Sequence, residues 1–346
     1  MNIQAELKQT IKDLVDSQRG ILAADESNPT MAKRFEAIDV TSNKESRRIW
    51  RSLLLSTPNL GEYISGVILF EETLGQKDDH QTLLPHLAWE QRIVPGIKVD
   101  KGKGALSGAP GDLITRGLDG LAERLAIYKQ QGARFAKWRE VYPITDKNPT
   151  RLGVVANAEV LARYAAVCQE IGIVPIVEPE VLMDGDHDIQ RCAEVTEQVL
   201  NEVFTALKLH GVILEQMLLK PNMVLPGKDC RTAEPREVAE ATLKILNRSV
   251  PAAVPSINFL SGGQEPEEAT ANLNAINQLA TSQLATGAPW QLSISYGRAL
   301  QQPALKAWKG LSQNLQAAQM ALLKRARLNS LARSGKYQAS DEVNIG

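Results

Sequence analysis

A lysine at the end of an apolar run is the residue whose type and setting best fit covalent chemistry. The run GVILEQMLLKP, residues 211–221, is nearly continuous in apolar side chains and ends in Lys220 followed by proline. Such a run predicts a strand buried on both faces. Burial disfavours a charged ammonium, and a neutral amine attacks carbonyl carbon. Lys220 is therefore a candidate for Schiff-base catalysis, and a lysine that reaches solvent from a strand end is the structural alternative.

Polar and charged residues also stand near the ends of other β-rich segments. They are Asp25, Glu26, Ser27, Lys98, Lys137, Arg139, Glu178, Glu180, Ser261, Gly262, Gly263, Ser295, Tyr296, Gly297 and Arg298. Alternate residues of a strand share a face, so Lys137 points with Arg139 and Glu178 points with Glu180. Buried charges must compensate one another. A structural ion-pair network is the alternative, but so many charges at one barrel mouth favour a catalytic site.

The residue types match the steps of carbon–carbon cleavage through an imine. Neutral Lys220 would attack a ketone, and like-charge repulsion from Lys137 would favour that neutral form. Glu178 or Glu180 could donate the proton that dehydrates the carbinolamine, and Asp25 could take the proton of the β-hydroxyl. The iminium would then accept the electrons of the broken bond as an enamine.

Glycine-rich and basic segments predict phosphate sites. Ser261 and Gly262, together with Gly297 and Arg298, would offer backbone N–H groups, a hydroxyl and a guanidinium. The glycines alone indicate only a turn, but they follow the seventh β-rich segment, near where barrels often bind phosphate. A second phosphate could be held by further basic side chains, namely Lys98, Arg139 and Arg34.

The elements that must position these residues alternate along the chain. The β-rich segments are GILAADES (20–27), YISGVILF (63–70), VPGIKVD (94–100), ARFAKWRE (133–140), VPIVEPE (174–180), GVILEQMLLK (211–220), SINFLSGG (256–263) and WQLSISYG (290–297). Helical patterns lie between them, and one has a predicted N-cap at Asn157 and a stop at Gly172. Strict alternation without a break in composition predicts a single closed α/β barrel, a (β/α)8 or TIM barrel, over an open doubly wound sheet.

We expect one catalytic barrel domain over residues 1–332 and a short polar tail over 333–346. An amphipathic N-terminal helix places Ile3, Leu7 and Ile11 on one face, and a long C-terminal helix runs from residue 303 to about 332. No low-complexity linker divides the chain. The polar composition of the tail predicts that it is mobile.

Composition excludes several functional classes. The chain has 346 residues and a net charge of −1, from 39 basic and 40 acidic residues, which argues against a nucleic-acid or membrane-surface binder. No apolar stretch approaches the roughly 18 residues of a membrane span. The N-terminus lacks the features of a signal or transit peptide. The three scattered cysteines read as reduced cytoplasmic thiols, so we expect a cytoplasmic protein.

Metal chemistry is not expected. The four histidines, His80, His86, His187 and His210, form no short ligand pair. The sequence DGDHD at 184–188 imitates the start of a calcium loop but lacks its later glycine and glutamate. The segment GKGALSG at 102–108 lacks the ending of a P-loop.

At these residues the chain resembles class I fructose-1,6-bisphosphate aldolase. The resemblance runs from about residue 15 to 337 and is carried by GILAADES, GVILFEETL, VPGIKVDKG, GLDGLAERLAIY, GARFAKWR, VPIVEPEVLMDGDHD, LEQMLLKPNMVLPG, INFLSGGQ, SYGRALQ and ALKAWKG. It implies that a homotetramer cleaves fructose 1,6-bisphosphate to dihydroxyacetone phosphate and glyceraldehyde 3-phosphate and also catalyses the reverse condensation. Neither a metal nor a cofactor would be needed. The alternatives are a related Schiff-base lyase for sedoheptulose 1,7-bisphosphate or fructose 1-phosphate, and a non-catalytic scaffold, which the intact motifs disfavour.

The resemblance assigns roles position by position. Lys220 matches the Schiff-base lysine, Glu178 and Glu180 the acid/base pair, Asp25 the residue that handles the C4 hydroxyl, and Lys137 the lysine beside the carbinolamine. The C1-phosphate site is matched by Ser261, Gly262, Gly297 and Arg298, with Ser295 as a further substrate-binding candidate. The region around the C6 phosphate is matched by Ser27, Thr30, Arg34, Lys98 and Arg139.

The chain departs from the family pattern in two places. Asn28-Pro29 stands where many members have Thr-Gly, and proline removes one N–H donor from that loop. The sequence ends in Asn344-Ile345-Gly346, whereas familiar members end in a tyrosine that helps to move the enamine proton. We therefore expect another proton carrier, such as the substrate phosphate or water.

Overall fold

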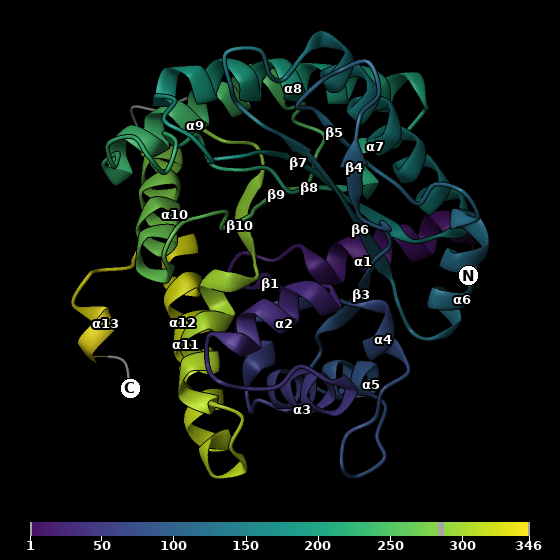
Figure 1. Ribbon diagram of the computed structural model, residues 1–346, viewed down its shortest axis with the longest axis vertical. Helices are drawn as coiled ribbons and strands as arrows, with labels where there is room; N and C mark the ends of the chain where they lie inside the picture. Colours follow the sequence, from purple (N-terminus) through teal and green to yellow (C-terminus); the bar gives the residue numbers. More distant parts are fainter. Residues whose placement is uncertain (1, 283–286, 345–346) are drawn as a thin grey trace.

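The computed structural model, which describes residues 2–282 and 287–344, is a closed barrel of parallel strands surrounded by helices (Figure 1). Neighbouring barrel strands follow one another in chain order, and the last pairs with the first. The barrel strands are β1 (Gly20–Ala24), β2 (Ile64–Leu69), β3 (Val94–Lys98), β6 (Phe135–Tyr142), β7 (Val174–Val181), β8 (Leu218–Leu219), β9 (Ser256–Phe259) and β10 (Gln291–Tyr296). The predicted fold class is confirmed.

Helices cover the outside of the barrel, and a short antiparallel hairpin lies between β3 and β6. The hairpin strands are β4 (Lys103–Ala105) and β5 (Leu113–Thr115). The helices are α1 (Ile3–Leu14), α2 (Asn28–Glu36), α3 (Lys44–Leu55), α4 (Glu71–Leu74), α5 (Leu84–Glu90), α6 (Leu121–Gln130), α7 (Arg151–Ile171), α8 (Ile189–Leu209), α9 (Pro235–Ser249), α10 (Pro266–Thr281), α11 (Arg298–Trp308), α12 (Leu315–Arg333) and α13 (Asp341–Asn344).

Helix α1 closes the N-terminal end of the barrel. Its buried Leu7 and Leu14 pack with residues that fill the barrel interior, among them Phe135, Val174 and Ile176. Desolvating this apolar face stabilises the docked helix at roughly 25 cal/mol for each Å² buried. These apolar side chains therefore fill the barrel interior at its N-terminal end.

The segment 211–220 is not the long strand that its apolar run predicts. Leu214–Gln216 form a 3-10 turn, and pairing with β7 and β9 is confined to β8. The side chain of Gln169 explains the difference: its Nε2 donates to the Ile213 carbonyl over 2.8 Å, and its Oε1 accepts from the Ile213 N–H over 2.9 Å. These bonds replace those of a strand. Lys220 directly follows β8 and is only 4% exposed.

Two predicted helix boundaries are also wrong. The helix expected from 303 to 332 is divided into α11 and α12, because Lys309 and Gly310 have φ of 52° and 71°. A Cβ at Gly310 would lie 2.5 Å from Val40, so the close approach of that side chain requires glycine. Helix α7 begins at Thr150, whose Oγ1 accepts from a backbone N–H 3.0 Å away, and the expected cap Asn157 is buried inside the helix.

The described part of the tail contacts helices α10 and α12. Tyr337 is 8% exposed, and its backbone N–H donates to Asn274 Oδ1 over 3.0 Å. The Glu342 carboxylate lies 2.6 Å from the buried Arg325 guanidinium and also accepts from the Tyr337 hydroxyl. An ion pair with a buried arginine holds this segment more firmly than an exposed pair would.

Candidate active site

A pocket of about 640 Å³ opens at the C-terminal ends of the barrel strands. It brings together all the residues predicted for the site. They are Asp25, Ser27, Thr30, Arg34, Lys98, Lys137, Arg139, Glu178, Glu180, Lys220, Ser261, Gly262, Ser295, Gly297 and Arg298. The opposite end carries a larger open cleft of about 840 Å³, lined by none of them. In barrels of this type, chemistry belongs to the C-terminal end.

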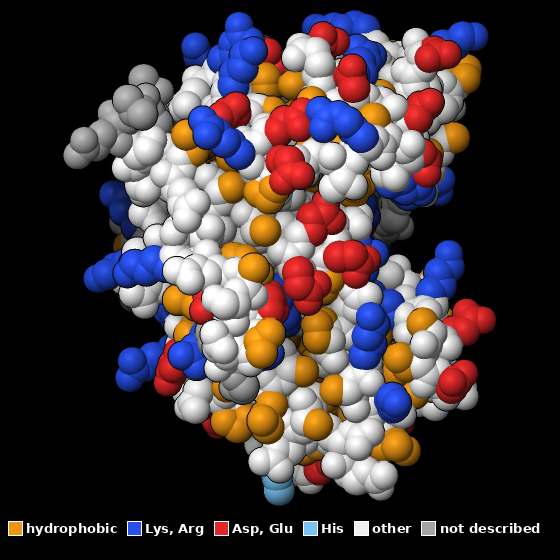
Figure 2. All heavy atoms as spheres, turned by 90° about the vertical axis from the view of Figure 1, so that its left-hand side faces the viewer, with side chains coloured by type: hydrophobic (Ala, Val, Ile, Leu, Met, Phe, Trp, Pro, Cys, Tyr) orange, Lys and Arg blue, Asp and Glu red, His pale blue; other side chains and the backbone are white. Residues whose placement is uncertain are grey.

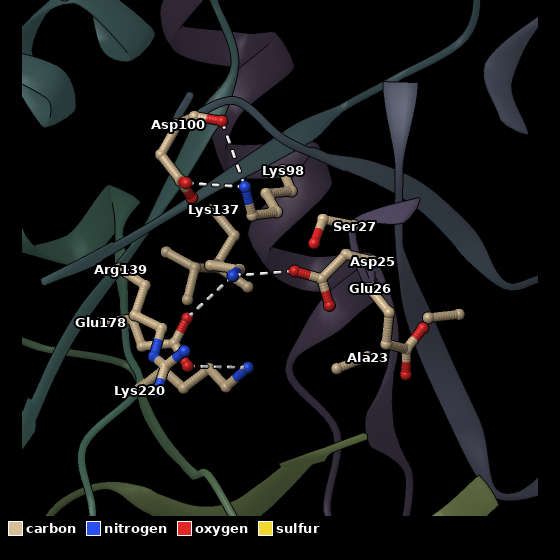
Figure 3. A network of polar contacts seen from close by, with 12 residues as sticks. Ala23, Asp25, Glu26, Ser27, Lys98, Asp100, Lys137, Arg139, Glu178 and Lys220 are labelled. Carbon is tan, nitrogen blue, oxygen red and sulfur yellow. Dashed lines mark hydrogen bonds and ion pairs between the residues drawn. The ribbon is translucent and has the colours of Figure 1, made fainter. Parts of the chain in front are cut away.

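A buried charge network stands at the floor of the pocket (Figure 3). The Lys137 Nζ lies 2.8 Å from Asp25 Oδ2 and 3.1 Å from Glu178 Oε2. The other oxygen of Glu178 lies 3.1 Å from Lys220 Nζ. These side chains come from β6, β7 and the residues that directly follow β1 and β8. Glu178 is thus shared between two amines, and Lys137 is shared between two carboxylates.

The network controls the protonation of its members. Burial acts to raise the pKa of Asp25, but the ammonium groups of Lys137 and Lys220 lower it well below its ordinary value. Burial also acts to raise the pKa of Glu178, but the positive charges of Lys137, Lys220 and Arg139 outweigh it and lower that pKa. Conversely, the two carboxylates outweigh burial and raise the pKa of Lys137. Both carboxylates and Lys137 are therefore charged at neutral pH.

Arg139 of β6 and Glu180 of β7 form an ion pair with each other beside this network. The Arg139 guanidinium binds the Glu180 carboxylate, and both residues lie two positions further along β6 and β7 than Lys137 and Glu178. Burial acts to lower the pKa of Arg139, but the Glu180 and Glu178 carboxylates raise it. Glu180 consequently faces a guanidinium, whereas Glu178 faces the two lysines.

One rim of the pocket carries the basic residues predicted for a second phosphate. Lys98 Nζ lies 2.6 Å from Asp100 Oδ1, and Arg34 lies 2.5 Å from Glu26 Oε1. The Ser27 hydroxyl contacts the Thr30 hydroxyl over 3.1 Å across the first turn of α2. Each predicted cation therefore already holds a carboxylate, which an incoming phosphate would have to displace or share.

The opposite rim is formed by the loop after β9 and the start of α11. Gly262 has a φ of 55°, which glycine adopts without strain. Arg298 reaches across from α11 and donates to the Gly263 carbonyl over 2.5 Å and to the Gln264 carbonyl over 2.8 Å. The Gly263 N–H donates to Met183 Sδ over 3.0 Å. The Gly263 N–H is therefore already engaged by a side chain in this structure.

Sequence reasoning missed the residues that hold the loop carrying Asp25. The buried Arg51 donates to the Ala24 carbonyl over 2.7 Å and pairs with Glu26 Oε2 over 3.0 Å. Gln301 donates to the Ala23 carbonyl over 2.6 Å and to Glu26 over 2.7 Å. Figure 3 shows the Glu26 carboxylate directed away from the lysines. No sequence motif connects α3, α11 and β1. The contacts of Arg51 and Gln301 with the loop that carries Asp25 are therefore seen only in the fold.

Glu140 anchors the β4–β5 hairpin to the strand that carries Lys137. It is fully buried, and its two oxygens accept from Trp138 Nε1 over 2.8 Å and from the Thr115 N–H over 3.0 Å. Burial raises the pKa of Glu140 to about 7, against the lowering effect of these hydrogen bonds. Lys103 of this hairpin lines the pocket, so Glu140 connects its position to β6.

Glu140→Gln is expected to change how stability depends on pH. Between the ordinary pKa of 4.5 and the folded value of about 7, the native state binds a proton that the unfolded chain lacks. The contribution of Glu140 is therefore complete below pH 4.5 and is lost as the pH rises through 7. The wild-type free energy of unfolding, relative to that of the variant, should fall by on the order of 3 kcal/mol across this window. Urea titrations at several pH values measure it, and parallel curves would contradict the prediction.

Comparisons with known proteins agree with this arrangement. The family model described as "Glycolytic: Fructose-bisphosphate aldolase class-I" matches residues 6–345. Fructose-bisphosphate aldolase 4, cytosolic, of Arabidopsis thaliana is 53% identical over 329 residues, or 95% of this chain and 82% of that protein. Fructose-bisphosphate aldolase C of Rattus norvegicus is 51% identical and covers 98% and 94%. This chain belongs to the class I fructose-bisphosphate aldolase family.

The aldolase fold is equally well matched in three dimensions. The fructose-bisphosphate aldolase of Plasmodium falciparum, solved in complex with TRAP and a small-molecule inhibitor, aligns with a TM-score of 0.94 at 48% identity and covers 97% of this chain and 96% of its own. Membership confirms the expected enzyme class and its fructose 1,6-bisphosphate aldolase activity, and it does not favour another phosphosugar lyase.

Over 2–282 and 287–344, no group of three or more His, Cys, Asp or Glu side chains is arranged to hold a metal ion. Within the same ranges, no helix has the length and apolar character that crossing a membrane requires.

Proposed function

We propose that this aldolase uses Lys220 as its Schiff-base nucleophile and the charge network around Lys137 as its proton-transfer system. The observation that carries the proposal is the geometry at Glu178, whose two oxygens lie 3.1 Å from Lys220 Nζ and 3.1 Å from Lys137 Nζ. A buried amine beside an ionised carboxylate can lose its proton locally, and a second, charged amine stands where an oxyanion would form.

Imine formation follows from this arrangement. Glu178 accepts the proton of the Lys220 ammonium, and the freed amine attacks C2 of the ketose. Lys137 stabilises the negative charge that develops on the C2 oxygen, because its own positive charge is fixed by Asp25 and Glu178. One proton then passes from the attacking nitrogen to the C2 oxygen and gives the neutral carbinolamine. Glu178 returns its proton to the carbinolamine hydroxyl, so that water leaves and the iminium remains. Glu180, held by Arg139, is assigned as the second member of the acid/base pair.

Bond cleavage is assigned to Asp25. It is ionised at neutral pH and accepts the proton of the C4 hydroxyl, while the C3–C4 bond breaks and its electrons enter the iminium. The aldehyde product leaves, and the enamine is protonated and hydrolysed to release dihydroxyacetone phosphate. Lys137 keeps Asp25 oriented through the 2.8 Å ion pair.

The two rims of the pocket are assigned to the two phosphates. The C1 phosphate is bound by the loop after β9 and the start of α11, through Ser261, Gly262, Gly297, Arg298 and the adjacent Ser295. The C6 phosphate is bound across the pocket through Ser27, Thr30, Arg34, Lys98 and Arg139. With its two phosphates bound at these two rims, an open-chain ketose bisphosphate would lie across the pocket that Lys220 lines.

We further propose a cofactor-free, metal-independent enzyme that is a cytoplasmic homotetramer, with residues 1–332 as its catalytic domain and no nucleic-acid or membrane partner. On the face drawn in Figure 2, basic and acidic side chains are interspersed, so this face offers no patch of one sign to a polyanion. Sedimentation equilibrium tests the assembly, and a monomer at micromolar concentration would contradict the tetramer.

The mechanism is tested by borohydride trapping with dihydroxyacetone phosphate, followed by peptide mass spectrometry. We expect a reduced adduct on Lys220, together with cleavage of fructose 1,6-bisphosphate that persists in excess EDTA. Omission of borohydride is the control for non-covalent retention. Activity that is abolished by EDTA, with Lys220 unmodified, would contradict both the nucleophile and the metal independence.

A further inference from the structure

Met183 contacts the loop that forms one rim of the pocket. It lies just after β7, and its Sδ accepts the Gly263 N–H over 3.0 Å. A Cβ built on Gly263 would lie 2.4 Å from that sulfur. The remaining space beside it is a cavity of only about 20 Å³, lined by both apolar and polar side chains. The sulfur and the glycine backbone are therefore packed in direct contact.

The accessibility of Met183 separates it from the other methionines of the described chain. Met31 and Met217 are fully buried, and Met223 is 1% exposed. Met320 is 55% exposed but lies on α12 and does not line the pocket. Met183 is partly exposed. Among the described methionines it alone combines access to solvent with contact to this loop.

We propose that Met183 is a reversible oxidation site, at which hydroperoxides weaken binding of the substrate phosphate. This inference rests on the proposed role of the 261–263 loop in phosphate binding. In the chemical step, a lone pair of Sδ attacks the terminal oxygen of the hydroperoxide and the O–O bond breaks. The departing oxygen takes a proton, so that one methionine sulfoxide and one water (or alcohol) form.

The effect of oxidation follows from the lack of space. The backbone of Met183 is held, because its carbonyl accepts the Lys228 N–H over 2.7 Å. The sulfur lies against the Gly263 backbone with no room for a further atom on that side. A sulfoxide is larger and more polar than the thioether, so it fits this contact only if the glycine loop shifts. Because Arg298 binds the Gly263 and Gln264 carbonyls, that shift also displaces the guanidinium assigned to the phosphate.

The cysteine closest to this region is a poor competitor for the oxidant. Cys192 lines the same small cavity, but it is 3% exposed, and burial raises the pKa of its thiol. A thiol with a raised pKa holds little of the reactive thiolate. Treatment with dithiothreitol after the oxidant reverses sulfenic acids and disulfides but leaves methionine sulfoxide, so it isolates the methionine chemistry.

The test exposes the aldolase to hydrogen peroxide, removes the peroxide with catalase and restores thiols with dithiothreitol. Peptide mass spectrometry then measures sulfoxide at Met183 and Met320, and steady-state kinetics measure cleavage of fructose 1,6-bisphosphate. We expect KM to rise by about tenfold, the loss of roughly one charge-assisted hydrogen bond, with a smaller change in kcat. Methionine sulfoxide reductases should restore KM. Met183→Leu should be insensitive to peroxide, and Met320→Leu should respond as the wild type does.

Two results would overturn the inference. One is complete sulfoxide formation at Met183 with an unchanged KM, and the other is oxidation confined to Met320. Arg298→Ala, assayed without oxidant, separates this failure from failure of the proposed phosphate site. If KM rises in Arg298→Ala but not on oxidation of Met183, the phosphate assignment stands and the oxidation site does not. If KM is unchanged in both, the phosphate assignment and the inference fail together.

Discussion

Lys220→Arg is expected to lower kcat for cleavage of fructose 1,6-bisphosphate by at least about 10⁴-fold, the scale on which removal of a covalent nucleophile acts. Arginine keeps the positive charge beside Glu178, whose oxygen lies 3.1 Å from the lysine amine. It cannot supply a neutral nitrogen, because the guanidinium does not lose its proton in proteins. The charge balance of the buried site is retained while the chemistry is removed. Initial rates and borohydride labelling measure the effect.

Lys228→Arg is the matched control for this substitution. Lys228 is exposed, pairs with Asp184 over 2.6 Å and does not line the pocket. The same exchange there should leave kcat and labelling unchanged. A Lys220→Arg enzyme that retains substantial activity, or that is still labelled by borohydride at another lysine, would refute Lys220 as the nucleophile. A circular dichroism spectrum like that of the wild type excludes unfolding as the cause of the loss.

Lys137→Met is expected to reduce both activity and stability, because it leaves two buried carboxylates without their shared cation. Breaking a buried ion pair from one side costs about 3–5 kcal/mol, and loss of the charge beside the reacting oxygen should lower kcat by roughly 10²- to 10³-fold. The pKa of Asp25, now held low by Lys137 and Lys220 against burial, should rise.

The pH dependence of Lys137→Met identifies the cause. In the wild type, the pKa of Asp25 is depressed below its ordinary 3.8, so its stabilising contribution is present above that pH and is lost only as the pH falls through the folded value. In the variant, Asp25 regains a proton at higher pH. The difference in unfolding free energy between the two proteins should therefore be largest near pH 7 and narrow toward pH 4. Urea titrations across this range measure it.

The double variant Asp25→Asn, Lys137→Met tests whether unpaired charge is responsible. It removes one of the stranded carboxylates together with the lysine, so it should recover part of the lost stability without recovering activity. A double variant as unstable as Lys137→Met alone would show that lost packing, and not the buried charge of Asp25, causes the destabilisation. Recovered activity would contradict the role of Asp25 as a base.

The sequence by itself determined the architecture and the membership of the site. Strict alternation of β-rich and helical segments specified a parallel barrel, since each strand returns to the same end only through a crossover helix. In such a barrel the residues that follow the strands must meet at one mouth. This is why the positions of Asp25, Lys137, Glu178 and Lys220 in the sequence predict that they lie together, although they are far apart in the chain.

The tertiary structure decided where long-range contacts override local pattern. The apolar run before Lys220 turns because Gln169, on α7, satisfies its backbone. The C-terminal helix divides at Gly310 because Val40 approaches it. Gln169 and Val40 are both distant in the sequence from the segments they contact. The local residue pattern therefore contains no sign of either contact.

The protonation of the site was also decided only in three dimensions. From sequence, Lys137 was expected mainly to repel the charge of Lys220. In the fold it is bound by the carboxylates of Asp25 and Glu178, which raise its pKa and make it the fixed positive charge of the network. Coulomb energy depends on the distance between atoms and on burial, and neither quantity is contained in the order of residues along the chain.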